Sequence, residues 1–193
     1  MKIRKQARIL TVILAGGQSR RMGRDKALMP CGNRSLIQRV AAEARKLGFP
    51  AVVSTAPGRI YPLTPSLAHV EDRYPGTGPL GAIVSVMETR KADYYLFWPV
   101  DMPLLTAEIW QRLLSEAEKN RISLLWPEIH GRVYPLPGIY SRELLPLLRE
   151  NLQNGHLALY PLRRHKASKI IDFSSFSSYF ANLNTPDDGH ICE

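Results

Sequence analysis

The sequence predicts an α/β protein: a three-layer α/β/α arrangement built on a Rossmann-like, mainly parallel sheet. Short β-branched apolar segments alternate with segments whose apolar residues recur at helical spacing, and Gly or Pro separates them. Such alternation is typical of right-handed strand–helix–strand units that cover a parallel sheet on both faces. With 193 residues, 45% of them hydrophobic, the chain suits one domain over residues 1–193, with a basic arm at 1–8.

The first half of the chain carries the clearer elements. The apolar segment 9–14 predicts a strand buried on both faces, and it runs into a pair of glycines. Ser35 is placed to cap a helix that Gly48 ends. The elements expected next are strands at 51–54 and 67–70, a helix opened by Pro79, a strand at 94–98 and a helix capped by Thr106.

The second half of the chain is less regular. A strand is expected at 122–126 and a helix at 142–151, and prolines break the segment 133–140 between them. Aromatic residues interrupt the serine-rich segment 174–178, which favours an anchored loop over a disordered tether.

Composition excludes several classes of protein. No apolar run approaches the roughly 20 residues of a membrane-spanning helix, so no membrane partner is expected. The basic start lacks the apolar region and cleavage pattern of a signal peptide. The two cysteines, Cys31 and Cys192, have no CxxC spacing. We therefore expect a cytoplasmic protein with free thiols.

The net charge of +9 indicates an anionic ligand. The distribution of the basic residues indicates which kind of anionic ligand to expect. One basic group, at residues 2–8, is interpreted as a solvated arm. The other lies inside a glycine-rich loop, where a phosphate would need countercharge, and consists of Arg20, Arg21, Arg24 and Lys26. A small polyanionic substrate is expected, and no nucleic-acid partner.

The loop after the first strand carries the strongest chemical signal. Gly16 and Gly17 allow backbone conformations closed to other residues, and successive exposed N–H groups can cradle anionic oxygens. Ligands of open α/β sheets bind beyond the carboxyl ends of the strands, where this loop begins. The pattern is neither GxGxxG nor GxxxxGK[ST], so it indicates a different kind of phosphate loop.

Polar residues elsewhere are expected at the same edge of the sheet. Asp101 follows the strand 94–98, and Mg²⁺ usually takes one or two carboxylates plus substrate phosphates. We expect Asp101 to hold Mg²⁺, with a turn or capping aspartate as the alternative. Asn182 and Asn184 alternate around Leu183, so both amides face one side of an extended segment.

The segment 14–26, LAGGQSRRMGRDK, resembles the signature loop of the molybdenum cofactor guanylyltransferase (MobA) family. Further matches follow in order at 78–81, 99–103 and 182–186, so the resemblance spans residues 9–187. It implies a fold of the nucleotide-diphospho-sugar transferase type. It also implies transfer of GMP from GTP to molybdopterin, with release of pyrophosphate and formation of the guanine dinucleotide cofactor.

The resemblance also implies site residues and partners. Lys26, Arg21 and Asp101 are the expected catalytic residues, and Asp101 is also the expected metal ligand. The nucleotide-binding residues are expected to be Leu14, Ala15, Gly16, Gly17, Lys26, Asp72 and Asp101. Substrate or product binding is expected at Gly78, Gly81, Asn182 and Asn184. Transient contacts are expected with proteins that deliver molybdopterin or mature molybdoenzymes.

Two features of the sequence bear on the choice of substrates. Relatives that use CTP commonly show Ala-Ala-Gly where this chain has Ala15-Gly16-Gly17, which favours guanine. Where the family carries arginines after the glycine near 155, this chain has His156-Leu-Ala158, on the expected pterin side. The alternatives are a cytidylyl- or sugar-phosphate nucleotidyltransferase on the same scaffold, or a non-catalytic cofactor-binding protein.

Overall fold

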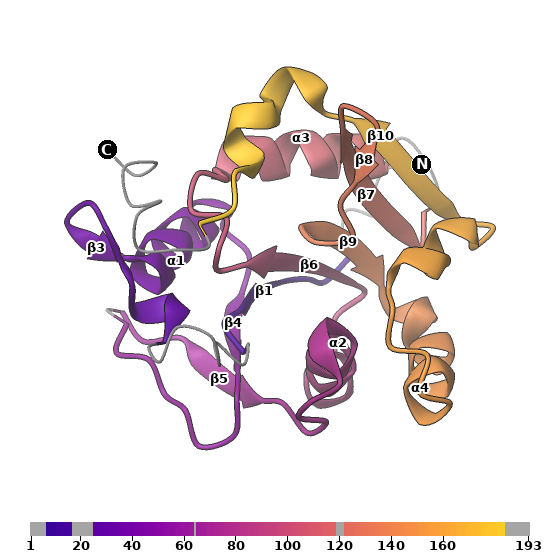
Figure 1. Cartoon of the computed structure of the whole chain (residues 1–193), viewed down its shortest axis with the longest axis horizontal. Helices are drawn as coiled ribbons and strands as arrows, with labels where there is room; N and C mark the ends of the chain where they lie inside the picture. The colour runs from indigo at the N-terminus through magenta and orange to yellow at the C-terminus, as the bar shows by residue number, and fades with distance from the viewer. Residues whose placement is uncertain (1–6, 17–24, 64, 119–121, 184–193) are drawn as a thin grey trace.

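The computed structural model describes residues 7–16, 25–63, 65–118 and 122–183, which form one central sheet with helices on both sides (Figure 1). The strands of this sheet are β1 (Ile9–Leu14), β4 (Ala51–Thr55), β5 (Ala68–Glu71), β6 (Tyr94–Pro99), β7 (Leu124–Ile129), β8 (Arg132–Val133), β9 (Gly138–Ser141) and β10 (Ser168–Asp172). Their order is β10-β7-β9-β6-β1-β4-β5, and β8 pairs with β7.

The sheet is mainly parallel. Parallel pairing joins β1 to β4 and β6, β4 to β5, and β7 to β10. The short strand β9 runs antiparallel between β6 and β7, and β8 is antiparallel to β7. The α/β class is confirmed, while the antiparallel strands were not predicted.

Two layers of helices complete the fold. Helices α1 (Leu36–Lys46) and α3 (Ala107–Glu118) cover one face of the sheet, and α2 (Gly78–Thr89) and α4 (Leu145–Gln153) cover the other (Figure 1). Because successive side chains of a strand point to opposite faces, β1 contributes to both cores. Ile13 packs on the side of α1, and Leu10 and Val12 pack on the side of α2. The predicted three-layer arrangement is confirmed.

Local sequence signals explain where α1 begins and ends. Ser35 precedes the helix with an extended backbone, and its N–H donates to Oε1 of Gln38 at 2.9 Å, as in a capping box. Gly48 has a φ of +74°, a left-handed conformation that glycine adopts without the cost of a Cβ. The helix capped by Ser35 and ended at Gly48 is therefore confirmed.

Short elements fill the connections. The 3-10 helices are η1 (Lys26–Leu28), η2 (Arg142–Leu144), η3 (Tyr160–Arg164) and η4 (Ser174–Phe180), and a separate hairpin joins β2 (Pro30–Cys31) to β3 (Arg34–Ser35). The segment expected to be an anchored loop forms η4. Phe173 and Phe180, 5% and 4% exposed, bury their rings in the core beside α3, which confirms the anchoring.

The structure corrects the expectation that the cysteines are free thiols. Cys31 is buried and disulfide-bonded, so the expectation of free thiols is wrong at this position. Cys192, the chain's other cysteine, lies outside the described residues.

Among the described helices, none is long and apolar enough to cross a membrane.

Candidate active site

Lys26 and Asp101 form the charged centre of one edge of the sheet, where the parallel strands β5, β4, β1 and β6 have their carboxyl ends. The Leu14 carbonyl at the end of β1 accepts a hydrogen bond from the N–H of Val100 at 3.1 Å, so the two strand ends are joined. Lys26 Nζ lies 3.0 Å from Asp101 Oδ2, with 19% and 30% of the two side chains exposed. Within the described ranges, Asp101 Oδ1 accepts no hydrogen bond. One carboxylate oxygen thus remains for a ligand.

Asn182 reaches this centre from the C-terminal part of the chain. The N–H of the next residue, Leu183, donates to the Asp101 carbonyl at 2.8 Å. Oδ1 of Asn182 is buried and has no hydrogen-bond partner in the part of the chain that is described. Because nearly all buried polar atoms in proteins are paired, this acceptor fits a group supplied by a ligand. Asn184 lies outside the described residues.

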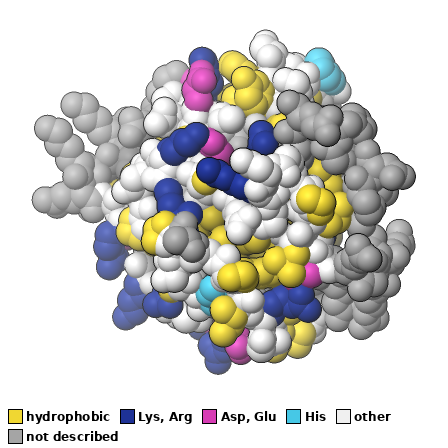
Figure 2. Space-filling view, turned by 90° about the vertical axis from the view of Figure 1, so that its left-hand side faces the viewer, with side chains coloured by type: hydrophobic (Ala, Val, Ile, Leu, Met, Phe, Trp, Pro, Cys, Tyr) yellow, Lys and Arg dark blue, Asp and Glu magenta, His cyan; other side chains and the backbone are white. Residues whose placement is uncertain are grey.

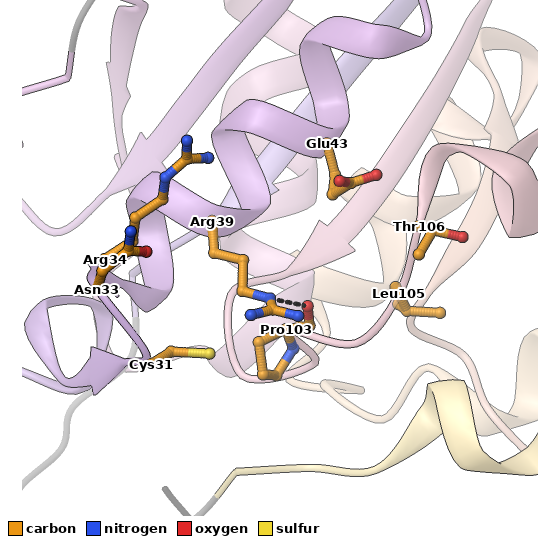
Figure 3. Close-up of a pocket in the computed structure, with 8 residues that line it drawn as sticks. All are labelled: Cys31, Asn33, Arg34, Arg39, Glu43, Pro103, Leu105 and Thr106. Atoms are coloured by element: carbon orange, nitrogen blue, oxygen red, sulfur yellow. Dashed lines mark hydrogen bonds between the residues drawn. The ribbon is translucent and has the colours of Figure 1, made fainter. Parts of the chain in front are cut away.

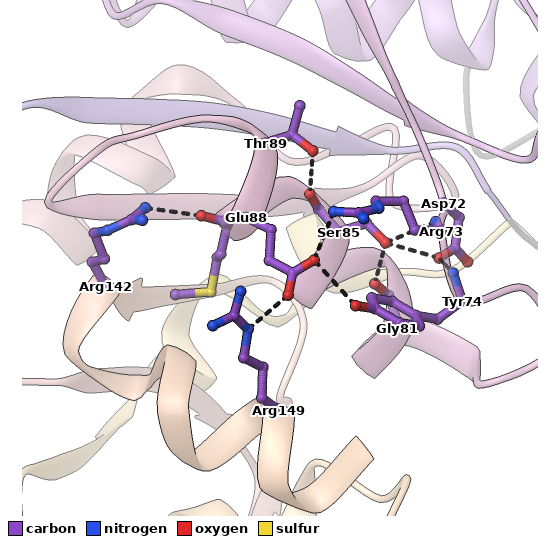
Figure 4. A network of polar contacts seen from close by, with 10 residues as sticks. Asp72, Arg73, Tyr74, Gly81, Ser85, Glu88, Thr89, Arg142 and Arg149 are labelled. Carbon is purple, nitrogen blue, oxygen red and sulfur yellow. Dashed lines mark hydrogen bonds and ion pairs between the residues drawn. The ribbon is translucent and has the colours of Figure 1, made fainter. Parts of the chain in front are cut away.

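Asp72 lies at the same edge, directly after β5, and a polar network holds it (Figure 4). Its N–H donates to the Thr55 carbonyl at 2.8 Å. Its Oδ1 accepts hydrogen bonds from the N–H of Tyr74 at 2.9 Å and from Oγ of Ser85 at 3.1 Å. Ser85 is fully buried in α2. Both of these hydrogen bonds go to Oδ1. No described residue donates to Oδ2 of Asp72, so this second oxygen can accept a hydrogen bond from a ligand.

Glu88 ties the turn that follows Asp72 to two helices. Its side chain is 8% exposed, and the carboxylate accepts hydrogen bonds from Arg73 Nη1 at 3.1 Å, from the Tyr74 hydroxyl at 3.1 Å and from Arg149 Nε at 2.6 Å (Figure 4). Burial of the phenol and its hydrogen bond to Glu88 raise the pKa of Tyr74, so the hydroxyl stays a donor. Glu88 therefore links α2, α4 and the Asp72 turn.

We expect Glu88→Ala to destabilise the protein, because the Tyr74 hydroxyl and two guanidinium groups lose a common acceptor. Both arginines are largely exposed, so solvent screening limits the loss of free energy of unfolding to about 1–2 kcal/mol. Thermal unfolding should show a fall of roughly 2–8 °C in Tm. Glu108→Ala is the matched control, because it removes an exposed carboxylate in the first turn of α3, paired with Arg112, and should lower Tm much less. An equal fall in both variants would contradict the assignment.

The site glycines differ in their surroundings. A Cβ on Gly16 would lie 3.2 Å from the backbone carbon of Thr55, so glycine lets the chain leaving β1 pass close to the end of β4. A Cβ on Gly81 would lie 2.7 Å from the Tyr74 carbonyl oxygen, so glycine lets α2 pack against the preceding turn. Gly78 opens α2, is exposed and has a φ of +66°. Contacts of these glycines with a ligand stay predictions.

Helix α1 holds the connection that follows Asp101. Arg39 Nε donates to the Pro103 carbonyl at 3.1 Å, and Oε2 of Glu43 accepts the N–H of Ala107, the first residue of α3, at 3.2 Å. A cavity of about 170 Å³ lies here (Figure 3). It is lined by Cys31, Asn33, Arg34, Arg39, Glu43, Pro103, Leu105 and Thr106. No local sequence pattern marks Arg39 or Glu43, because their partners lie 64 residues away.

The remaining predicted site residues, Gly17 and Arg21, lie outside the described residues. Figure 2 shows Lys and Arg side chains spread over the face at the left of Figure 1, with few acidic side chains between them, in line with the net charge of +9.

Within the described ranges, no group of three or more His, Cys, Asp and Glu side chains could hold a metal ion.

Sequence relatives agree on one family. The model of the MobA-like NTP transferase domain matches residues 11–168. A probable molybdenum cofactor guanylyltransferase from Carboxydothermus hydrogenoformans is 31% identical over 189 residues, covering 93% of this chain and 92% of the relative. A molybdenum cofactor guanylyltransferase from Xanthomonas euvesicatoria is 39% identical over 180 residues, covering 91% and 89%.

Solved structures share the fold. Molybdopterin-guanine dinucleotide biosynthesis protein A from Archaeoglobus fulgidus matches with a TM-score of 0.77 at 20% identity, covering 95% of this chain and 96% of that one. 2-C-methyl-D-erythritol 4-phosphate cytidylyltransferase from Thermus thermophilus matches with a TM-score of 0.68 at 16% identity, covering 94% and 96%. These likenesses confirm the predicted nucleotide-diphospho-sugar transferase type of fold.

The sheet edge that carries Lys26 and Asp101, together with this fold and these relatives, defines a class of enzyme: the chain is a nucleotidyltransferase. Within that class it belongs to the MobA-like NTP transferase family, with molybdenum cofactor guanylyltransferases as relatives over nearly its whole length. The family predicted from the loop at 14–26 is therefore confirmed.

Proposed function

We propose that the protein transfers the GMP part of GTP to the terminal phosphate of molybdopterin, forming the guanine dinucleotide form of the cofactor. The observation that carries the proposal is the Lys26–Asp101 pair, which lies at the sheet edge where the signature loop leaves β1. Asp72 ends the strand β5 at the same edge. The names of the sequence relatives, which are molybdenum cofactor guanylyltransferases, support guanine as the base and the pterin cofactor as the acceptor.

In the proposed reaction the chain's own residues bind, orient and neutralise charge. A phosphate oxygen of molybdopterin bonds to the α-phosphorus of GTP. The bond from that phosphorus to the oxygen leading to the β-phosphate breaks, and its electron pair leaves with pyrophosphate. Such transfers need little covalent chemistry from a protein, because positioning and charge stabilisation supply most of the rate.

Three described side chains have separate parts in this proposal. Lys26 places its ammonium group beside the triphosphate and offsets the negative charge that builds up on the leaving pyrophosphate. Asp72 offers Oδ2 to a donor on the nucleotide, while its other oxygen stays bonded to Tyr74 and Ser85. Asn182 offers its buried Oδ1 to a second donor on a substrate.

We further propose that Asp101 holds Mg²⁺. The donor set fits, because a carboxylate is a hard oxygen ligand and one of its oxygens is not engaged by the described residues. When bound, Mg²⁺ supplies positive charge to phosphate oxygens. The carbonyl of Asp101 accepts the N–H of Leu183, so Asp101 keeps its position relative to Asn182.

The test is an incubation of the purified protein with Mg²⁺, molybdopterin and either GTP or CTP, followed by mass spectrometry. We expect a guanine dinucleotide and pyrophosphate with GTP. A cytidine product from CTP with none from GTP would overturn the choice of base. Use of a sugar phosphate instead of molybdopterin would overturn the acceptor. Binding of both substrates without release of pyrophosphate would favour a non-catalytic cofactor-binding protein.

A further inference from the structure

Tyr61 lies in the connection between β4 and β5, and its hydroxyl contacts both ends of the signature loop. The hydroxyl lies 2.9 Å from Asp25 Oδ2 and 3.2 Å from the Ala15 carbonyl oxygen. Ala15 follows β1 directly, and Asp25 directly precedes Lys26. The Tyr61 residue is only 3% exposed, so water competes little for these contacts. The hydroxyl oxygen therefore lies between two acceptor oxygens from positions that are ten residues apart in sequence.

Asp25 connects Tyr61 to the backbone next to Lys26. Its Oδ1 accepts the N–H of Ala27 at 3.0 Å and so caps η1, whose first residue is Lys26. Its Oδ2 accepts hydrogen bonds from Tyr61 and from Arg59. The Asp25 side chain is 14% exposed. Because both carboxylate oxygens are engaged, the backbone next to Lys26 is held in place, and Lys26 Nζ reaches Asp101 from there.

The chemistry of the hydroxyl favours Asp25 as its acceptor. A hydroxyl has one proton to donate, and the charged carboxylate at the shorter distance is a stronger acceptor than the carbonyl. Burial, followed by the hydrogen bond to Asp25, raises the pKa of Tyr61, so it stays protonated at neutral pH. Loss of the hydroxyl would leave a mostly buried carboxylate oxygen with one donor fewer.

We propose that Tyr61 is a positioning residue of the nucleotide site: its hydrogen bond to Asp25 fixes the start of η1 and so holds Lys26 opposite Asp101. This inference rests on the proposed function only in that Lys26 acts on a nucleotide. A cationic group that is fixed before substrate binds needs no reorganisation during the reaction. Small displacements of such a group are costly in rate.

The test begins with Tyr61→Phe, which removes only the hydroxyl. The ring keeps its place beside His69, at a centroid distance of 6.3 Å, and the backbone N–H keeps its bond to His69 Nε2 at 3.0 Å. We expect kcat for nucleotidyl transfer to fall roughly 10- to 100-fold, with a smaller change in KM. Under native conditions, trypsin should cleave after Arg20, Arg21 and Arg24 several times faster than in the wild type, as followed by mass spectrometry.

Tyr140→Phe is the matched control. Tyr140 is also buried, and its hydroxyl donates to a single backbone carbonyl, that of Pro135, at 2.9 Å. It lies on β9 and has no hydrogen bond to the signature loop among the described residues. We expect a loss of stability similar to that of Tyr61→Phe, with kcat and loop cleavage unchanged. A fall in kcat and a rise in loop cleavage equal to those of Tyr61→Phe would make the Tyr61 effect one of general stability and overturn the proposal.

A double-mutant cycle with Asp25→Ala, which removes the acceptor of the Tyr61 hydroxyl, tests the route of the effect. If Tyr61 acts through Asp25, Tyr61→Phe should change kcat and cleavage little in the Asp25→Ala background. Additive effects, or unchanged kcat and cleavage in Tyr61→Phe alone, would overturn the proposal. If the wild type transfers CMP instead of GMP, the proposed function fails, and the same cycle measured with CTP still tests Tyr61. If the wild type transfers no nucleotide, the rates of tryptic cleavage decide.

Discussion

Asp101→Ala should abolish nucleotidyl transfer while leaving the fold intact. The substitution removes the carboxylate proposed to hold Mg²⁺ and leaves Lys26 without the contact at 3.0 Å. Because loss of one electrostatic stabiliser costs about 10²–10³ in kcat, loss of the metal ligand should cost at least that much. Steady-state rates of pyrophosphate release at several Mg²⁺ concentrations measure the effect. Tm should change little, because 30% of the side chain is exposed and it packs in no core.

Two variants separate the charge of Asp101 from its shape and place. Asp101→Asn keeps the shape and a carbonyl oxygen for Lys26 but loses the negative charge, so we expect nearly the same loss of activity. Asp93→Ala removes an aspartate just before the other end of β6, where it pairs with Arg8, and should keep full activity. Near-normal, Mg²⁺-dependent transfer by Asp101→Ala would show that another group holds the metal.

The sheet edge could be predicted because it depends on local patterns. The run at 9–14 and the run at 94–98 each predict a buried strand, and they pair in register as β1 and β6 from Ile9 and Tyr94 onward. In a parallel sheet the residues that follow such strands gather at one edge. That rule alone places Asp101 near the loop that leads to Lys26. In the structure, Asp101 Oδ2 lies 3.0 Å from Lys26 Nζ.

The parts that were missed depend on contacts between distant segments. Prolines break the pattern around β9, and β9 becomes a strand because β6 and β7 both pair with it. Strand β10 is partly exposed, and among the described strands it pairs with β7 alone. No local period marks either strand, so only the assembled sheet explains them.

The polar residues that hold the site were missed for a similar reason. Ser85 and Glu88 lie on a helix with an apolar pattern, their partners in the Asp72 turn lie 12 to 15 residues earlier, and Arg149, the other partner of Glu88, lies 61 residues later. Tyr61 lies in a segment rich in proline and glycine, 36 residues from Asp25. Polar side chains whose partners are distant in sequence are recognised as part of a site only in the folded structure, where the partners lie beside them.

Gly16 changes the argument about the base. Glycine at this position, where relatives that use CTP commonly have alanine, favoured guanine in the sequence analysis, but a Cβ here would meet the backbone of Thr55 and Ala56 at 3.2 and 3.3 Å. The close approach of the chain to the end of β4 therefore explains glycine at position 16, whichever nucleotide base the protein uses. Comparing incorporation from GTP and CTP is the direct way to establish the base.

Lys26→Ala should lower kcat/KM for GTP by about 10²–10³, because one fixed cation beside the transferring phosphates is lost. Lys26→Arg should recover only part of this loss, since the planar guanidinium keeps the charge but not the compact shape of the ammonium. Stability should fall by about 1 kcal/mol or less, as for a partly exposed ion pair. Lys169→Ala breaks a pair with Glu116 of similar exposure, on the strand β10, and should match that loss of stability without a loss of activity. If the two alanine variants were equally active, the Lys26–Asp101 contact would be structural, and the triphosphate would have to be neutralised by other residues of the signature loop.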